Sequence, residues 1–141
     1  MVKLRKIEES DLEFLLEVRN DETTRYYLVN DNTFNLEECT EWFRETQPKL
    51  LIIENELGER VGYFKTNDSN EIGCDIHPNF RRKGYARKAY QEYLKENTDV
   101  SLWVFRDNFA LNLYSDLGFV ENGESKEIRG REFIQMTYSK S

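Results

Sequence analysis

Apolar and polar residues alternate along much of this chain with a period of two, which is the pattern of strands that bury one face. The predicted strands are residues 4–7, 50–54, 60–66, 71–77, 100–105, 121–128 and 131–138. The polar turn at 55–58 predicts that the two strands around it form a hairpin. The strand 121–128 is polar enough to lie at the edge of a sheet.

Helical spacing, with apolar residues three or four positions apart, replaces this alternation at four places. The predicted helices begin near residues 12, 36, 83 and 108. Ser10 with Glu13, and Asn35 with Glu38, have the spacing of capping boxes that would start the first two helices. Residues 20–33 follow neither period, and we expect an irregular segment there that contains a short helical turn and lines a pocket.

The order of these elements predicts the fold class. One strand, two helices, a meander of three strands, a helix, a strand, a helix and a final strand pair follow one another. We therefore expect an α/β (α+β) fold, in which a mixed, mostly antiparallel central sheet of about six to seven strands carries helices on both faces. With 141 residues, the chain has the length of one domain spanning residues 1–141.

The charge balance limits the partners of the chain. A net charge of -7 and a pI of about 4.9 disfavour binding to nucleic acid, because neutralising phosphates requires an excess of Lys and Arg. The longest apolar run, 50–53, is too short to cross a membrane, and residues 1–6 lead into charges instead of a signal-peptide core. We expect a cytoplasmic protein that binds neither nucleic acid nor a membrane.

Cysteine and histidine are rare in this sequence, which contains Cys39, Cys74 and His77 and no others of these types. In a cytoplasmic protein, two cysteines are expected to be reduced thiols in the core instead of a disulfide. One histidine and two distant cysteines do not make a ligand set for zinc, so we expect no metal.

The strongest local signal for chemistry is a basic turn between a strand and a helix. After Pro78, the residues Arg81-Arg82-Lys83-Gly84-Tyr85-Ala86 precede the third predicted helix. Such a turn directs backbone N–H groups into one concavity at a helix N-terminus, which favours an anion such as a diphosphate. Gly84 would let that anion approach the backbone, with counter-charge from Arg81, Arg82, Lys83 and Arg87. An ordinary basic helix start is the alternative interpretation.

Two stretches carry a resemblance to a known family. Residues 76–86, Ile-His-Pro-Asn-Phe-Arg-Arg-Lys-Gly-Tyr-Ala, resemble the Arg/Gln-x-x-Gly-x-Gly/Ala signature of the GNAT superfamily of N-acetyltransferases and the Val/Ile-x-Pro end of its preceding strand. Residues 108–119 resemble the family's second segment, in which Asn and Ala precede Leu-Tyr-x-x-x-Gly-Phe. The two motifs occur in the family's order, and the predicted elements match the family fold over essentially the whole chain.

The resemblance implies an enzyme that uses acetyl-CoA to acetylate a primary amine by direct attack on the thioester. It implies that a backbone N–H of Ile76 or His77 stabilises the oxyanion and that the phenol of Tyr114 protonates the departing thiolate. A core tyrosine is the alternative for Tyr114, and helix capping is the alternative for Asn108. The implied cofactor-binding residues are Ile76, His77, Arg81, Arg82, Lys83, Gly84, Tyr85, Ala86, Arg87, Asn108 and Ala110.

The catalytic base is less well defined by the sequence. Some peptide N-terminal acetyltransferases of the family carry a glutamate in the strand before the second motif, and Trp103 occupies that place here. Asp75 and Glu71 remain, both on the polar face of the strand 71–77, and we rank Asp75 first because it lies nearer the expected reaction centre. His77 ranks third. For each of the three, a solvated strand residue is the alternative.

The acceptor is left open by the sequence. The first half of the chain resembles the branch of ribosomal-protein N-terminal and nucleotide-linked amino-sugar acetyltransferases, although Val18 replaces the tryptophan of that branch. Arg19 or Arg25 could meet a phosphate or carboxylate, and Trp42 is expected in the core or a pocket wall. The acceptor is a peptide or protein amine, an amino sugar or a small amine. A catalytically silent acyl-CoA-binding module is the alternative function, and the oligomeric state, a homodimer included, stays open.

Overall fold

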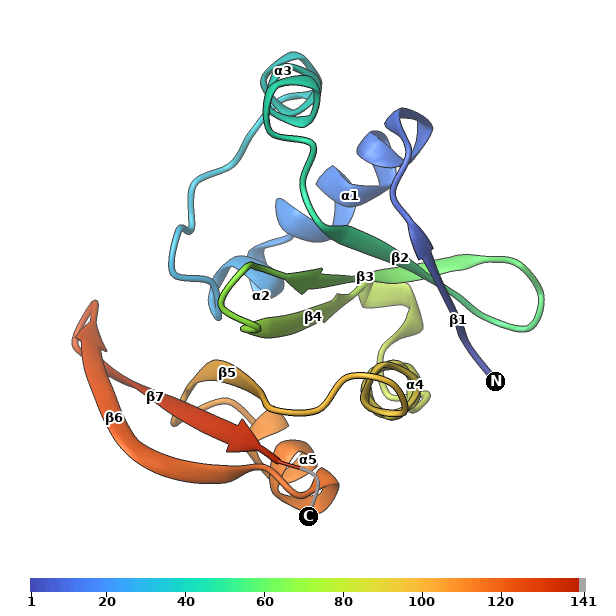
Figure 1. Cartoon of the computed structure of the whole chain (residues 1–141). Helices are drawn as coiled ribbons and strands as arrows, with labels where there is room; N and C mark the ends of the chain where they lie inside the picture. Colours follow the sequence, from blue (N-terminus) through green and yellow to red (C-terminus); the bar gives the residue numbers. More distant parts are fainter. Residues whose placement is uncertain (140–141) are drawn as a thin grey trace.

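The computed structural model describes residues 1–139 (Figure 1). The strands are β1 (Lys3–Lys6), β2 (Leu50–Glu54), β3 (Arg60–Thr66), β4 (Ile72–Ile76), β5 (Val100–Phe105), β6 (Val120–Ile128) and β7 (Arg131–Tyr138). The α-helices are α1 (Leu12–Arg19), α2 (Glu22–Arg25), α3 (Leu36–Thr46), α4 (Tyr85–Leu94) and α5 (Ala110–Leu117). Two 3₁₀ turns, η1 (Glu9–Asp11) and η2 (Pro78–Phe80), precede α1 and follow β4.

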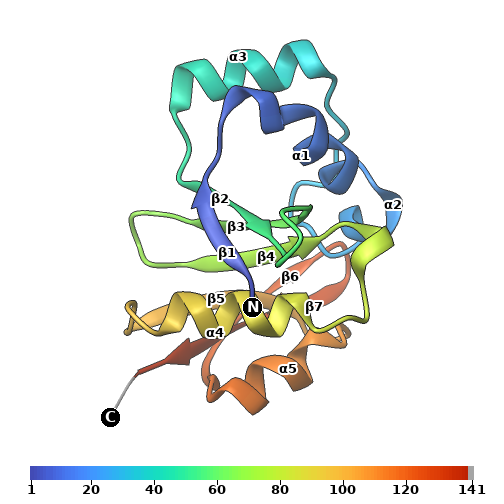
Figure 2. The same ribbon diagram turned by 90° about the vertical axis from the view of Figure 1, so that its right-hand side faces the viewer.

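The strands form two antiparallel sheets. The first has the order β1-β2-β3-β4 and the second the order β5-β7-β6. A single parallel bridge between Glu71 and Ser101 connects them. Helices α1 and α3 lie on one side of the first sheet and α4 on the other, with α5 beyond α4 (Figures 1 and 2). The predicted fold class is therefore confirmed, although the sheet is divided between β4 and β5.

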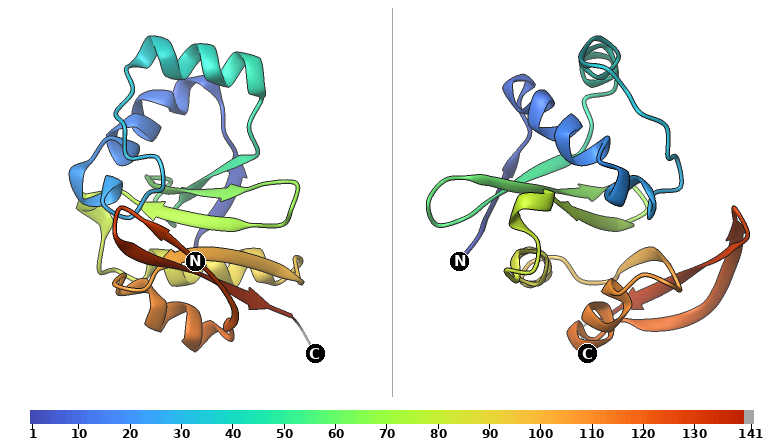
Figure 3. Two further views of the ribbon diagram at one scale, coloured as in Figure 1. Left: turned by 90° about the vertical axis from the view of Figure 1, so that its left-hand side faces the viewer. Right: turned by 180° about the vertical axis from the view of Figure 1, so that it is seen from behind.

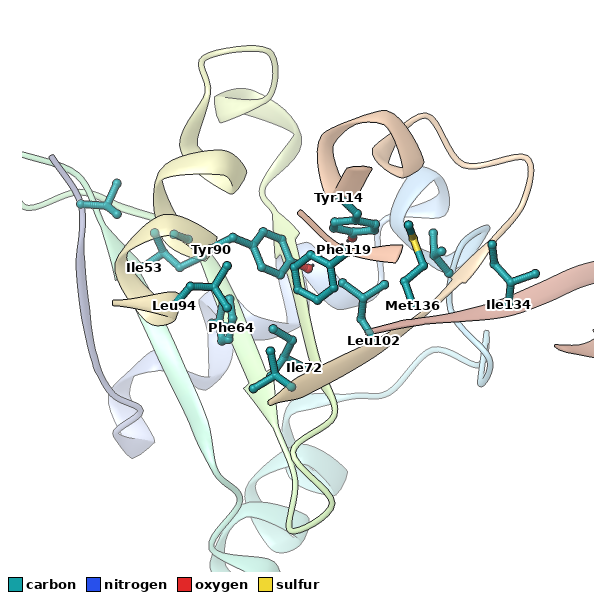
Figure 4. Packing of buried hydrophobic residues seen from close by; sticks show 14 of the residues in the cluster. Ile53, Phe64, Ile72, Tyr90, Leu94, Leu102, Tyr114, Phe119, Ile134 and Met136 are labelled. Atoms are coloured by element: carbon teal, nitrogen blue, oxygen red, sulfur yellow. Dashed lines mark hydrogen bonds between the residues drawn. The ribbon is translucent and has the colours of Figure 1, made fainter. Parts of the chain in front are cut away.

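Each side of the first sheet has its own apolar core. One cluster joins α1 and the start of α3 to β2 and β3, and it contains Leu12, Val18 and Tyr63. The larger cluster fills the space between the two sheets and helices α4 and α5 (Figure 4). Strand β6 is exposed along most of its length and forms the edge of the second sheet, as its polar sequence predicts.

Capping boxes were predicted at the starts of α1 and α3, and the structure confirms the second of them. At α3, Asn35 Oδ1 accepts from the Glu38 N–H at 2.8 Å and Glu38 Oε1 accepts from the Asn35 N–H at 3.0 Å, which confirms that capping box. The prediction for Ser10 and Glu13 is wrong. There the box is formed by Glu8 and Asp11, because the turn η1 precedes the helix and Asp11 is held by two bonds to Arg5.

One glycine allows β3 and β4 to approach closely beside the site. A Cβ atom on Gly62 would lie 2.4 Å from the Asp75 carbonyl oxygen and 3.0 Å from Ile76 Cα. Both are backbone atoms of the neighbouring strand, so a side chain at this position would push the strands apart. Gly62 thereby fixes the place of Asp75 and Ile76 in the sheet.

Candidate active site at the divergent strands

Strands β4 and β5 run side by side at one end and then diverge (Figures 1 and 3). At the joined end, the Ser101 N–H donates to the Asn70 carbonyl at 3.0 Å. Beyond that point, no backbone hydrogen bond joins the two strands within the described part of the chain. Each strand therefore has an open edge with backbone donors and acceptors available to a ligand.

The pairing of β4 with β3 determines which amides face this open edge. The His77 N–H donates to the Val61 carbonyl at 2.8 Å. Because hydrogen-bonding direction alternates along an antiparallel pair, the N–H of Asp75 also faces β3, while those of Cys74 and Ile76 face away from it. Of the two predicted oxyanion donors, Ile76 has its amide at the open edge and His77 has its amide in the sheet.

Glu71 braces the joined end of the two strands. Its Oε1 accepts from Asn67 Nδ2 at 2.8 Å and its Oε2 accepts from Trp103 Nε1 at 2.9 Å. These two bonds lower the pKa of the Glu71 carboxyl, with Asn67 contributing most. Trp103, which replaces the glutamate of some family members, thus holds a carboxylate from the neighbouring strand, and Glu71 has little capacity left to accept a proton.

The N-terminus of α4 forms a concave group of free amides. Arg82 and Gly84 have left-handed φ angles of 63° and 80°, and the first helical bond runs from the Lys88 N–H to the Gly84 carbonyl at 3.1 Å. The amides of Tyr85, Ala86 and Arg87 consequently have no partner within the helix, and Gly84 provides no capping side chain. A hollow of about 250 Å³, lined also by Ile76 of β4 and Leu113 of α5, lies at this end.

The four basic residues of the turn have different surroundings. Arg81 points inward, where its Nε donates to the Ile76 carbonyl at 3.2 Å and its Nη2 donates to Thr24 Oγ1 at 2.7 Å. It connects β4 to α2 and has few donors left for a phosphate. Arg87 pairs with Asp116 of α5 at 3.2 Å. Arg82 and Lys83 are exposed beside the free amides, so they are the two cations best placed to meet an anion there.

Two buried tyrosines meet between α4 and α5 (Figure 4). The Tyr90 hydroxyl lies 3.2 Å from the Tyr114 hydroxyl and donates to it, and the two rings are packed edge to face. Burial raises the pKa of the Tyr114 phenol, and the Tyr90 bond acts in the opposite direction. Tyr114 therefore holds its proton at neutral pH, and since it is the acceptor in this bond, its own O–H is free to donate elsewhere. The sequence identified Tyr90 as a core residue only.

Asn108 has the capping geometry that was its alternative interpretation. Its Oδ1 accepts from the Ala110 N–H at 2.9 Å, and its carbonyl accepts from the Leu111 N–H at 3.1 Å. These bonds fix the start of α5 and so the place of Tyr114, one turn further along the helix. The Asn108 side-chain amide N–H groups remain available to a ligand.

Asp75 lies on the face of β4 that α1 and α3 cover. Its cross-strand neighbour is Tyr63. Its Oδ2 is buried without a hydrogen bond and lies 3.4 Å from Lys65 Nζ. Of the two predicted carboxylate bases, Asp75 is the one whose oxygens are not both occupied by donors. Its charge also raises the pKa of Tyr114, after the larger effects of burial, the Tyr90 bond and Cys74.

His77 is held in a structural arrangement. Its ring stacks on Phe14 with centroids 5.8 Å apart, and its Nδ1 accepts from the Asn79 N–H at 3.1 Å. This bond caps the turn η2. The imidazole therefore supports the end of β4, with one of its two nitrogens already engaged.

The irregular segment after α2 is fastened by the distant β6-β7 hairpin (Figure 3). Arg129 donates to the carbonyls of Leu28 and Val29 at 2.7 and 2.8 Å, and Arg131 donates to the carbonyl of Tyr26 at 2.6 Å. These contacts span about a hundred residues of sequence and enclose one side of the divergent strands. The only sequence signal for them is the pair of arginines on either side of Gly130.

Within residues 1–139, no three His, Cys, Asp or Glu side chains gather closely enough to hold a metal ion. Over that same range, no helix combines the length and the apolar character needed to span a bilayer.

Comparisons with known proteins agree with this architecture. A family model described as an acetyltransferase (GNAT) domain matches residues 2–105, whereas no curated protein matches the chain. The structure is similar to that of spermidine N-acetyltransferase from Vibrio cholerae in complex with CoA and spermine, with a TM-score of 0.84 and 22% identity over 96% of this chain and 93% of that one. A GNAT-family acetyltransferase from Bacillus anthracis gives 0.80 and 19% over 96% and 92%. At such identities the likeness concerns the fold.

Proposed function

The chain belongs to the GNAT family of acetyltransferases, and we therefore propose that it transfers the acetyl group of acetyl-CoA to a primary amine by direct attack on the thioester. An acyl-transferring enzyme of this family uses acetyl-CoA as its co-substrate. The observation that carries the proposal is the adjacency of two features, the open edge of β4 at Ile76 and the free amides at the start of α4, which line one hollow.

The residues present fit this co-substrate. The diphosphate of CoA needs closely spaced N–H donors and positive charge, and the amides of residues 85–87 with Arg82 and Lys83 offer both. The pantetheine arm of CoA contains amide groups, which can pair with the open edge of β4 as an added strand would. Leu113 and Ile76 provide the apolar walls between these two parts.

The proposed chemistry divides between the two faces of the sheet. Asp75, on the face covered by α1 and α3, accepts a proton from the ammonium of the acceptor and so produces the nucleophilic amine. The Ile76 N–H donates to the carbonyl oxygen as negative charge develops on it. When the new C–N bond has formed, the nitrogen loses its second proton to solvent. As the C–S bond breaks, Tyr114 gives its own proton to the departing thiolate and recovers one from solvent. The products are the N-acetylated amine, CoA and one proton.

The assay that tests the function is release of free thiol from acetyl-CoA with a panel of primary amines. Turnover on at least one amine, reduced about 10²- to 10⁴-fold in Tyr114→Phe, is the expected result, because this range is typical for losing a general acid. Tight CoA binding without turnover on any amine, unaltered by Tyr114→Phe, would instead establish the silent binding module.

A matched pair of glycine variants tests whether the diphosphate of CoA binds at the start of α4. Gly84 and Gly58 have φ angles of 80° and 79°, and no atom lies within 4 Å of a Cβ built on either. Replacing each with Glu therefore adds the same backbone strain and charge, but only Gly84→Glu places the carboxylate at the start of α4. We expect calorimetry to show CoA affinity at least tenfold weaker in Gly84→Glu and unchanged in Gly58→Glu. Equal CoA affinities in the two variants would show that the diphosphate does not bind at this turn.

A further inference from the structure

A second and larger hollow lies on the opposite side of the first sheet from α4. It has a volume of about 500 Å³ and is enclosed by α1, α3 and the ends of β2 and β3; we call it the helix pocket. Its walls are mainly apolar, and the apolar lining residues include Leu15, Leu16, Phe34, Cys39, Trp42 and Leu50. The volume suits a small organic molecule.

The floor of the helix pocket contains a tyrosine hydroxyl without a hydrogen-bond partner among the described residues. Tyr63 lines the pocket and is only 1% exposed, and its hydroxyl has no hydrogen-bond partner within residues 1–139. Lys65, also in the lining, lies 3.4 Å from the buried Oδ2 of Asp75, which likewise makes no hydrogen bond. Tyr63 and Asp75 are cross-strand neighbours, so their two unpaired oxygens belong to one polar group at the pocket floor. Buried polar atoms are nearly always paired, and a polar group of a ligand would complete this one.

Opposite charges flank this hydroxyl. Asp75 is the cross-strand neighbour of Tyr63 on β4, and Arg19 lines the same pocket as Tyr63. Burial raises the pKa of the Tyr63 phenol, Asp75 raises it further and Arg19 lowers it. The Arg19 guanidinium donates to the carbonyls of Asn30 and Asn32 at 2.6 and 3.2 Å. These partners are neutral, the guanidinium also lies over the Phe34 ring, and no carboxylate among residues 1–139 forms an ion pair with Arg19. Its charge is thus available to an anion.

We propose that the helix pocket binds the acceptor amine and that this acceptor is an apolar α-amino acid or a close analogue. Its ammonium group faces Asp75, its carboxylate faces Arg19, and the Tyr63 hydroxyl donates between them. Its side chain occupies the apolar space beside Trp42 and Leu15. This assignment rests on the proposed function, since it supplies the amine that the acetyl transfer requires.

The lining discriminates against other classes of amine. Of the three cationic residues in the lining, Lys49 pairs with Asp68 and Lys65 lies 3.4 Å from Asp75, so Arg19 is left without a carboxylate partner among residues 1–139. The one carboxylate in the lining, Glu38, already accepts from the Asn35 N–H through its Oε1. A polyamine such as spermine would bring several positive charges toward this lining and be repelled. A simple alkylamine would fill the apolar space but leave Arg19 without an anion. An amino acid zwitterion pairs its ammonium with Asp75 and its carboxylate with Arg19, and it provides a hydrogen-bond partner for the Tyr63 hydroxyl.

Matched substrate pairs test this directly, because removing the carboxylate from leucine gives isopentylamine and removing it from phenylalanine gives phenethylamine. We expect a KM at least tenfold lower for each amino acid than for its decarboxylated partner, and no measurable turnover of spermidine. A KM for the alkylamines equal to or below that of the amino acids would overturn the proposal, and so would preferred turnover of spermidine.

Three variants locate the effect in the helix pocket. Arg19→Gln is expected to raise the KM for leucine about tenfold and leave that for isopentylamine unchanged. Arg44→Gln, which removes an arginine of α3 that pairs with Glu9 outside the pocket, should change neither. Tyr63→Phe keeps the ring and removes only the hydroxyl, and it should raise the KM for leucine several-fold. Equal effects of Arg19→Gln on both amines would refute the carboxylate site.

Binding separates this inference from the proposed function. The chain contains two tryptophans, so in Trp103→Phe the fluorescence reports on Trp42 in the pocket wall alone. With CoA present, saturable quenching by leucine that Arg19→Gln weakens would support the pocket even if no amine is acetylated. Acetylation of some amine, without any leucine-dependent change at Trp42, would support the function and overturn the pocket assignment.

Discussion

The hydroxyl pair of Tyr90 and Tyr114 allows the proposed acid step to be tested one atom at a time. Tyr90→Phe removes the donor to the Tyr114 oxygen and preserves the ring, which is fully buried and packs against Phe64 and Phe119. Tyr90 itself has no role in binding either substrate in the proposed mechanism. Its hydroxyl acts through Tyr114, by stabilising the phenolate that forms when Tyr114 releases its proton.

The magnitude follows from how the bond changes during the reaction. A hydrogen bond to a neutral oxygen is worth about 1 kcal/mol, and one to a charged oxygen about 1.5–3 kcal/mol. The difference, roughly 1 kcal/mol, is the stabilisation that appears only as the phenolate forms, and it corresponds to about a fivefold change in rate. Because the bond also lowers the pKa of Tyr114, its removal leaves a weaker acid.

Single-turnover acetyl transfer measures this step without interference from product release. We expect Tyr90→Phe to slow it about fivefold with unchanged KM for both substrates, and Tyr90→Phe with Tyr114→Phe to be no slower than Tyr114→Phe alone. Tyr93→Phe is the control, since Tyr93 lies on the same helix and stacks on the same Phe64 ring. Two results would refute the proposed action of Tyr90 through Tyr114. One is an equal single-turnover rate in Tyr90→Phe and Tyr93→Phe. The other is a double variant whose rate loss is the product of the two single losses.

Three further predictions concern the framework of the site. Gly62→Ala should destabilise the fold by about 1–3 kcal/mol in urea unfolding and reduce activity, whereas Gly73→Ala, whose Cβ meets only the flexible Lys65 side chain, should be near neutral; equal losses would contradict this. Burial opposes the charge of Asp11, but the bonds from Arg5 outweigh it and hold its pKa below 3.8. The resulting stability is complete above about pH 4 and lost as pH falls through the folded-state pKa, so Asp11→Asn should flatten the acid side of a stability profile. Burial raises the pKa of the Cys74 thiol, which keeps it protonated. Cys74→Ala should therefore still release free thiol from acetyl-CoA. Loss of thiol release in this variant would indicate a covalent intermediate on Cys74.

Local patterns predicted the strands better than the junctions between them. Strands β2, β3, β5 and β7 have the predicted bounds to the residue, because their alternation is regular and polar turns end them. Helix α4 begins two residues later than predicted, at Tyr85. The left-handed conformations of Arg82 and Gly84 cause this delay, and a non-glycine residue in that conformation has no reliable sequence signal.

The roles of charged residues were harder to predict, because they depend on contacts between distant segments. The sequence grouped Arg81 with the phosphate-binding cations, but its partners Thr23 and Thr24 lie more than fifty residues earlier. Asp75 and Glu71 share one strand face and looked equivalent, until Asn67 and Trp103 were seen to occupy both oxygens of Glu71. Composition and spacing nominated both carboxylates, and only the fold distinguished Glu71, whose oxygens are both occupied, from Asp75, which remains the proposed base.

The division of the sheet also explains why direct transfer suits this site better than a covalent intermediate. Asp75 and Tyr114 lie on opposite faces of β4, with the open edge at Ile76 between them. In the proposed mechanism, an amine on the side of α1 and a thioester on the side of α4 therefore meet across that edge, each beside the group proposed to move its proton. A covalent route would need a nucleophile at the same edge, and Cys74, the nearest thiol, is kept protonated by its burial. The proposed mechanism thus has both substrates bound together, with the amine facing the proposed base Asp75 and the sulfur facing the proposed acid Tyr114.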